Sequence, residues 1–198
     1  SGLQADSGHV LGCAVRADLP VTFIGRKVGC YLGAGPDHAG KIVFDDLEVP
    51  LGAYEASKPT LSLLDESVVQ AALPVRGRTA HKGRHGHVLV IGGAAGMGGA
   101  VHLAAAAALR AGAGLVTVAA HPHSLGALVS RPELMSLAVD GASAMERGFE
   151  RATVLALGPG LGQSPWAKEI FDAALAAQKP VVVDADALNL LALNPRKC

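Results

Sequence analysis

The sequence predicts an α/β fold in which a mainly parallel sheet carries helices on both faces. From residue 87 onward, short and continuous apolar runs alternate with helical patterns, and such runs are typical of strands that are covered on both sides. Three of the four runs are followed by glycines or a carboxylate, and ligands in such folds bind at the loops after the strands. This rhythm of strand, helix and strand implies right-handed crossovers, and therefore parallel strands.

The turn residues give the bounds of these elements. Gly112 ends an alanine-rich helix, whereas Ser164 and Pro165 supply an N-cap and a first helical position for the next helix. A further helix is expected to begin near Leu188. The predicted strands cover 87–91, 115–119, 154–157 and 180–183, and the predicted helices cover 99–111 and 165–177.

The first 50 residues have a different character. Stretches 14–24 and 41–49 are rich in Val, Ile and Phe and are predicted as strands, although so short a segment is unlike an independent domain. Segment 50–59 has the composition of a linker. Apolar residues at helical spacing follow it from Leu61 to Leu73, so we predict a domain boundary between these parts.

Charge and cysteine content favour a protein that handles small molecules. The 17 basic and 17 acidic residues of the 198-residue chain cancel, which argues against binding to nucleic acid or an anionic membrane. Cys13, Cys30 and Cys198 lack the spacing of a zinc site and are expected to be reduced thiols in the cytoplasm. We expect no signal peptide, and the start without Met suggests a piece of a longer protein.

The loop after the first predicted strand, residues 92–100, is the strongest candidate for ligand binding. Its glycines allow a ligand to approach backbone N–H groups at a helix N-terminus, which suits phosphates. It is not a P-loop, since Gly99 stands where lysine is required, and it is not a dinucleotide fingerprint, since Val101 stands at the third glycine. A tight turn without a ligand is the alternative interpretation.

Two further loops follow later strands. Residues 158–162 again place amides before a helix, and we expect this bend to converge with the bend at 92–100 on one shared site. In an extended stretch, Asp184 and Asp186 would point the same way and could position a hydroxyl, a water or a magnesium nucleotide. Alternatively, one of the two carboxylates caps the helix that follows.

A basic stretch at residues 76–86 precedes the first strand of the alternating pattern. Its glycines allow it to fold closely, so Lys82 could face an anionic ligand across the strand ends. A solvated loop is the alternative, and the spacing of the histidines in this stretch does not match a zinc site.

Taken in order, these motifs resemble the ADP- or ATP-dependent NAD(P)HX dehydratases, which have a ribokinase-like fold. The resemblance covers residues 74–192 in register. The matching segments are His81-Lys82-Gly83, residues 86–93, Met97-Gly98-Gly99-Ala100, residues 109–117, Pro132-Glu133-Leu134-Met135, Gly158-Pro159-Gly160-Leu161-Gly162 and residues 184–189.

The beginning of the chain separately resembles the last third of the NAD(P)HX epimerase domain, a Rossmann-like α/β domain. Ser1 matches a serine ligand to potassium in that family, and the adjoining segments Ala5-Asp6-Ser7-Gly8 and 14–18 match as well. We therefore assign residues 1–52 to the C-terminal part of an epimerase domain and 53–73 to a linker and leading helix. Residues 74–198 are assigned to the N-terminal part of a dehydratase domain.

The resemblance implies repair of damaged nicotinamide cofactors. The epimerase would interconvert the R and S hydrates of NADH and NADPH with K⁺, and the dehydratase would restore the S form with ADP or ATP and Mg²⁺. Family substrate contacts map to Ala100 and Gly160, with Gly99, Lys82 and Asp184 as supporting residues. The family's catalytic base is expected beyond Cys198, so no catalytic residue is assigned, and this chain alone is expected to be inactive.

Other functions remain open at this point. A ribokinase-like kinase of a vitamin precursor or sugar would share the fold and the loop chemistry, and a non-catalytic nucleotide-binding protein would fit a chain that lacks its base. An NAD-linked oxidoreductase fits less well, because the fingerprint is missing. For the full-length protein the resemblance predicts a homo-oligomer that binds NADHX, NADPHX and ADP, with neither nucleic acid nor membrane as a partner.

Overall fold

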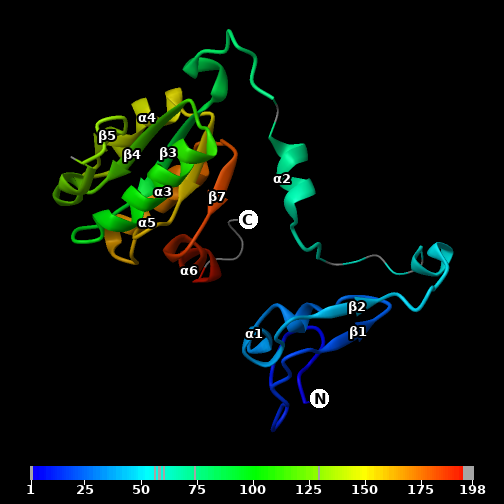
Figure 1. Ribbon diagram of the computed structural model, residues 1–198. Coiled ribbons are helices and arrows are strands. Elements are labelled where there is room, and N and C mark those ends of the chain that lie inside the picture. The colour runs from blue at the N-terminus through cyan, green and yellow to red at the C-terminus, as the bar shows by residue number, and fades with distance from the viewer. Residues whose placement is uncertain are drawn as a thin grey trace. The chain divides into compact units, whose positions relative to one another are not determined.

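The protein consists of two compact units, Ser1–Val75 and Arg76–Cys198 (Figure 1). The computed structural model describes residues 2–55, 57, 59, 61–73, 75–128 and 130–193. All three candidate ligand loops belong to the second unit. The assignment of the first unit to an epimerase stays a prediction.

The first unit holds a two-stranded parallel sheet of β1 (Val21–Phe23) and β2 (Val43–Asp45), with helices α1 (Gly35–His38) and α2 (Glu66–Ala72). The strands are much shorter than the apolar stretches that predicted them. The helix predicted from residue 61 begins instead at Glu66, because the Asp65 carboxylate accepts hydrogen bonds from the first-turn amides.

The first unit buries little apolar surface. In its described part no hydrophobic side chain is among the fully buried ones, and several large apolar residues are about half exposed, including Val21, Phe23 and Leu32. Hydrophobic burial is the main favourable contribution to folding. The described contacts within this unit therefore supply little stability, and the core of the protein lies in the second unit.

The second unit is built on a five-stranded, wholly parallel sheet with strand order β5-β4-β3-β6-β7. The chain starts at the central strand β3, builds outward through β4 to β5, and then crosses to the other side for β6 and β7. The strands are β3 (His87–Gly92), β4 (Leu115–Ala120), β5 (Met135–Ala138), β6 (Val154–Leu157) and β7 (Val181–Val183).

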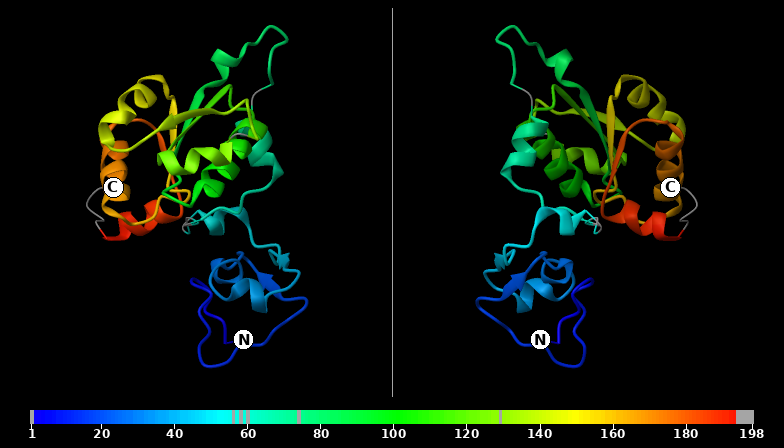
Figure 2. Two further views of the ribbon diagram at one scale, coloured as in Figure 1. Left: turned by 90° about the vertical axis from the view of Figure 1, so that its left-hand side faces the viewer. Right: turned by 90° about the vertical axis from the view of Figure 1, so that its right-hand side faces the viewer.

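Helices cover both faces of this sheet, as predicted (Figure 2). On one face α3 (Gly98–Ala111) packs through Val101 and Ala105 against β3 and β4. On the other face lie α4 (Glu146–Arg151), α5 (Pro165–Ala176) and α6 (Asp186–Leu193). In the described part of the chain, no helix is long and apolar enough to cross a membrane.

The predicted strands and helices of this unit are confirmed to within a few residues, with two omissions. Strand β5 and helix α4 were not predicted as separate elements. β5 is an edge strand of four residues with alternating half-buried and exposed positions, and α4 is a helix of six residues. Elements this short carry too few residues for a period to be recognised.

His87, at the start of β3, is a buried histidine that is 8% exposed. Its Nε2 lies 2.8 Å from the Thr117 hydroxyl on β4. Burial, with a further contribution from the positive charge of Arg151, lowers the pKa of His87 below its ordinary value of 6.5. The folded protein therefore favours a neutral imidazole at this position.

This lowered pKa predicts a loss of stability at mildly acidic pH. Above the ordinary pKa of 6.5, His87 is neutral in the folded and unfolded states alike. As the pH falls below that value, the unfolded state binds a proton first, so the free energy of unfolding decreases. Urea denaturation at about pH 7.5 and about pH 5.5 measures the decrease, which should be smaller for His87→Gln than for the exposed control His81→Gln. Equal decreases in both variants would contradict the prediction.

Candidate functional site

The strand order creates a topological switch point between β3 and β6. The chain leaves β3 toward one face through α3 and leaves β6 toward the other face through α5. In open α/β sheets, ligands bind beyond the carboxyl ends of the strands at such a point. The bends at 92–100 and 158–162 follow these two strands, so the sheet topology places both glycine-rich loops at the position where a ligand is expected.

The two bends are joined directly by backbone hydrogen bonds. Gly93 N–H donates to the Pro159 carbonyl over 3.0 Å, and Ala94 N–H donates to the Gly160 carbonyl over 2.7 Å. The predicted convergence of the bends is therefore observed. Whether they bind a cofactor stays a prediction.

Gly160 lies where a side chain would not fit. Its φ is +59°, and a Cβ at this position would lie 2.8 Å from the Met97 carbonyl oxygen and 3.0 Å from the Ala100 Cβ. The predicted contacts Ala100 and Gly160 are therefore neighbours, on the first turn of α3 and on the bend after β6. Their role as substrate contacts stays a prediction.

The N-terminus of α3 lies beside this junction and has no side-chain cap. The first N–H groups of an α-helix have no partner within the helix, and no side chain caps α3 at Met97. Gly99 is exposed, and a Cβ added to it would meet no atom within 4 Å. Gly98 is buried, so an anionic group could approach this helix end at Gly99, where the positive end of the helix dipole would favour it.

The third loop joins the second through a carboxylate. Asp186 Oδ2 accepts a hydrogen bond from Gly162 N–H over 2.8 Å, and Asp186 is already the first residue of α6. The expectation that Asp184 and Asp186 point the same way from an extended stretch is therefore wrong, because α6 begins two residues earlier than predicted. Asp184 is exposed just beyond the end of β7, and Asp186 has a structural role.

Removing the Asp186 carboxylate should therefore destabilise the bend. We expect Asp186→Ala to lower the free energy of unfolding by about 1–2 kcal/mol, since a charge-assisted hydrogen bond to a half-buried amide is lost. The control Asp184→Ala removes an exposed carboxylate and should change stability by less than about 0.5 kcal/mol. Chemical denaturation of both variants measures the two losses in the free energy of unfolding. Equal losses would show that the hydrogen bond to Asp186 does not stabilise the bend.

The loop after β4 flanks the site and was missed in the sequence. His121 N–H donates to the Gly93 carbonyl over 3.1 Å, and the Ser124 hydroxyl donates to the Ala94 carbonyl over 2.6 Å. The His121 ring packs edge-to-face on Trp166 of α5, with centroids 5.6 Å apart. The position of His121 at the end of a predicted strand was the available signal.

Lys82 does not lie near the two bends. It begins a 3₁₀ turn, Lys82–His85, that precedes β3, and its carbonyl lies against Gly114, just before β4. It therefore lies at the amino-terminal edge of the sheet, opposite the two bends. The expectation that Lys82 faces a ligand at the carboxyl ends is corrected by the parallel direction of the strands.

The structure leaves two predicted functional features untested. Ser1, the predicted potassium ligand, lies outside the described residues, and the predicted catalytic base lies beyond Cys198. Among the described residues, no group of three or more His, Cys, Asp or Glu side chains is arranged to hold a metal ion. Asp184 is exposed, and its contact to a magnesium nucleotide stays a prediction.

A parallel sheet with helices on both faces and amide-lined bends at its switch point defines an α/β protein of the ribokinase-like class. One solved structure of this class, a ribokinase-like superfamily protein from Enterococcus faecalis, is 28% identical with a TM-score of 0.62, over 70% of this chain and 52% of that one. The family described as NAD(P)H-hydrate dehydratase matches residues 88–197, and the chain belongs to this family.

Similar proteins agree with this assignment. The bifunctional NAD(P)H-hydrate repair enzyme of Coxiella burnetii is 47% identical over 98% of this chain, and the enzyme of the same description from Escherichia coli is 40% identical over 100% of it. This chain covers 40% and 38% of those two proteins. It therefore spans about two fifths of the length of the relatives that it matches.

A dehydratase of this family has a solved structure that resembles the chain. The ADP/ATP-dependent NAD(P)H-hydrate dehydratase from Bacillus subtilis, co-crystallized with ATP and Mg²⁺, is 29% identical with a TM-score of 0.53. The match covers 63% of this chain and 46% of that protein.

Proposed function

We propose that this chain forms part of an enzyme that repairs hydrated NADH and NADPH, and that its second unit supplies the first half of the dehydratase site. The single observation that carries the proposal is the meeting of the two amide-lined bends at the switch point between β3 and β6. The B. subtilis relative, described as ADP/ATP-dependent and co-crystallized with ATP and Mg²⁺, supports a magnesium nucleotide as the second ligand.

In the proposed reaction, the ring hydroxyl of the S hydrate loses its proton and takes the terminal phosphoryl group of ADP or ATP, and AMP or ADP leaves. Loss of phosphate from the phosphorylated carbon and of a proton from the adjacent ring carbon then restores the nicotinamide double bond. Phosphate is a far better leaving group than hydroxide. The nucleotide supplies the phosphoryl group, and Mg²⁺ would offset its negative charge. The residues of this chain would hold the cofactor hydrate on the α3 amides and against Ala100 and Gly160.

The first unit extends the proposal to the epimerase. The C. burnetii and E. coli relatives are described as bifunctional and match this chain across both of its units. We therefore assign residues 1–52 to the C-terminal part of an epimerase domain that interconverts the R and S hydrates with K⁺ bound in part by Ser1. Residues 53–73 are the linker and leading helix, and 74–198 belong to the dehydratase. The parent protein would be a homo-oligomer in the cytoplasm.

An assay of the full-length protein tests this proposal. We expect loss of NADHX and formation of NADH that depend on added ADP or ATP, and slower loss without Mg²⁺. Phosphorylation of an unrelated alcohol without repair would favour a ribokinase-like kinase instead. Nucleotide binding without turnover would favour a non-catalytic binding protein, and either result would overturn the repair function.

A further inference from the structure

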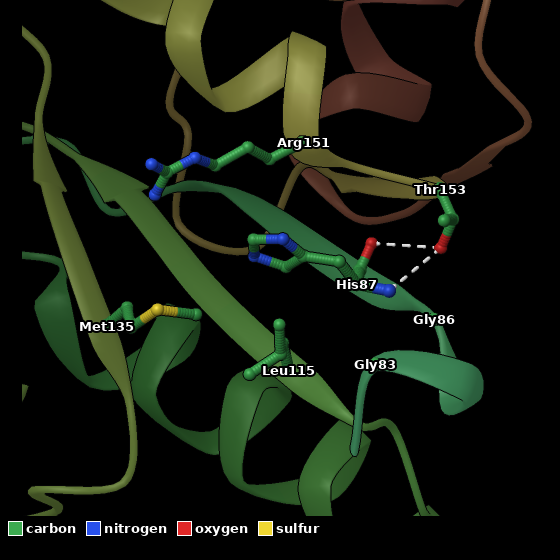
Figure 3. Close-up of a pocket in the computed structure, with 7 residues that line it drawn as sticks. All are labelled: Gly83, Gly86, His87, Leu115, Met135, Arg151 and Thr153. Carbon is green, nitrogen blue, oxygen red and sulfur yellow. Dashed lines mark hydrogen bonds between the residues drawn. The ribbon is translucent and has the colours of Figure 1, made fainter. Parts of the chain in front are cut away.

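A cavity lies at the amino-terminal edge of the sheet, opposite the two bends, and the proposed repair reaction does not use it. It has a volume of about 330 Å³, which lies at the small end of the range for ligand pockets. Figure 3 shows the residues that surround it. The lining residues are Gly83, Gly86, His87, Leu115, Met135, Arg151 and Thr153.

The cavity exists because the helices leave this end of the sheet partly uncovered. His87 pairs with Leu115 in the β3–β4 register, and Met135 pairs with Thr117 in the β4–β5 register. These side chains share the face that α4 and α5 cover farther along the strands, where Leu89 and Leu155 are buried. Helix α4 has only six residues and ends at Arg151, so the first residues of the strands keep an accessible apolar wall.

The mouth of the cavity carries a positive charge. Figure 3 shows the Arg151 side chain extending from the end of α4 across the space toward which the His87 ring and the Met135 side chain also point. None of the residues lining the cavity is acidic. The Arg151 guanidinium is therefore available to an external anion.

The wider sequence reinforces this charge. Between Glu66 and Glu133 the chain has no acidic residue, although it has six arginines and lysines in that interval. Lys82 and Arg84 of the turn before β3, and Arg110 in the last turn of α3, belong to the same edge of the sheet. Basic side chains near the carboxyl-terminal end of a helix stabilise that helix. Several of them at one edge of the sheet also attract anions.

His87 adds a directed polar group to the wall. Its Nε2 is hydrogen-bonded to the Thr117 hydroxyl, and its backbone N–H donates to the Thr153 hydroxyl over 2.9 Å. These bonds fix the ring at the cavity. If Nε2 accepts from Thr117, then Nδ1 carries the proton and can donate to a bound anion.

We propose that this cavity is a binding site for a small organic anion, with a phosphate or carboxylate on Arg151 and His87 and an apolar body against Leu115 and Met135. The apolar wall distinguishes the site from a surface that merely attracts inorganic ions. The site is also distinct from the two bends, because it lies at the amino-terminal ends of the strands and the bends follow the carboxyl ends.

Phenyl phosphate is the probe that combines both features, and it can be titrated into the full chain by calorimetry. Benzyl alcohol has the ring without the charge, and inorganic phosphate has the charge without the ring. We expect each of these two to bind at least about tenfold more weakly than phenyl phosphate, since each loses one set of contacts. Inorganic phosphate binding as tightly as phenyl phosphate would overturn the apolar half of the proposal.

Two variants of helix α4 locate the site. Arg151→Gln should weaken phenyl phosphate binding by about tenfold or more, whereas Arg147→Gln, on the same helix but away from the cavity, should leave it within about twofold. In NMR spectra, the imidazole signals that move should be those absent from His87→Gln. Unchanged affinity in Arg151→Gln, or movement of the His121 signals instead, would place the anion elsewhere and end the proposal.

Discussion

Replacing Gly158 with alanine is expected to lower the free energy of unfolding of the second unit by about 3–5 kcal/mol. Gly158 has a φ of +129°, and an added Cβ would lie 1.8 Å from the Asp184 carbonyl oxygen and 3.0 Å from the Ala187 Cβ. The nearest obstacle is backbone at the end of β7, which cannot rotate away. The chain would have to separate the bend after β6 from the loop after β7.

Gly96→Ala is the matched control for this prediction. Gly96 also has a positive φ, +82°, but a Cβ there would meet no atom within 4 Å. The control therefore measures backbone strain without the collision, and we expect a loss of about 1–2 kcal/mol. Urea denaturation of both variants gives the two values. A Gly158→Ala variant as stable as Gly96→Ala would show that the loops do not pack as described.

Replacing Gly99 with aspartate is expected to weaken cofactor binding without weakening the fold. The position is exposed with open space around it, and a carboxylate in the first turn of α3 suits the positive end of the helix. The same carboxylate would compete with a ligand phosphate for the first-turn amides and repel it. We expect the affinity of the full-length protein for NADPH to fall by about tenfold or more.

Gly99→Ala separates the effect of charge from that of bulk. Alanine adds a methyl group without a charge, and its affinity for NADPH should stay within about threefold of the unchanged protein. Thermal unfolding of both variants should remain within a few degrees of the original. If Gly99→Asp and Gly99→Ala weaken NADPH binding equally, the added charge is not the cause of the weakening. That result would contradict phosphate recognition by the α3 amides.

The sequence predicted the sheet of the second unit well, because its strands are buried on both faces. Residues 88–91 form a run without a polar position, and the glycines at 92 and 112 give the strand and helix ends. The first unit was harder, since its strands β1 and β2 have only three residues each and lie amid exposed apolar side chains. Exposed apolar residues give a segment the composition of a strand, so the sequence predicted longer strands than the structure has.

The site was predictable where backbone chemistry determines it, and less so where tertiary contacts do. Glycine spacing identified the bends that contain Ala100 and Gly160. The hydrogen bond from Gly162 N–H to Asp186 links residues 24 positions apart. A local sequence pattern therefore could not predict it. The wrong placement of Lys82 has a similar origin, because closeness to a strand in sequence does not say at which end of the sheet a ligand binds.

A crystal structure of the full-length protein with NADPH tests the central claim most directly. The account predicts a cofactor phosphate within hydrogen-bonding distance of the amide groups of residues 98–100, with the rest of the cofactor in contact with the bend at 158–162. Cofactor bound elsewhere, with both bends untouched, would contradict it.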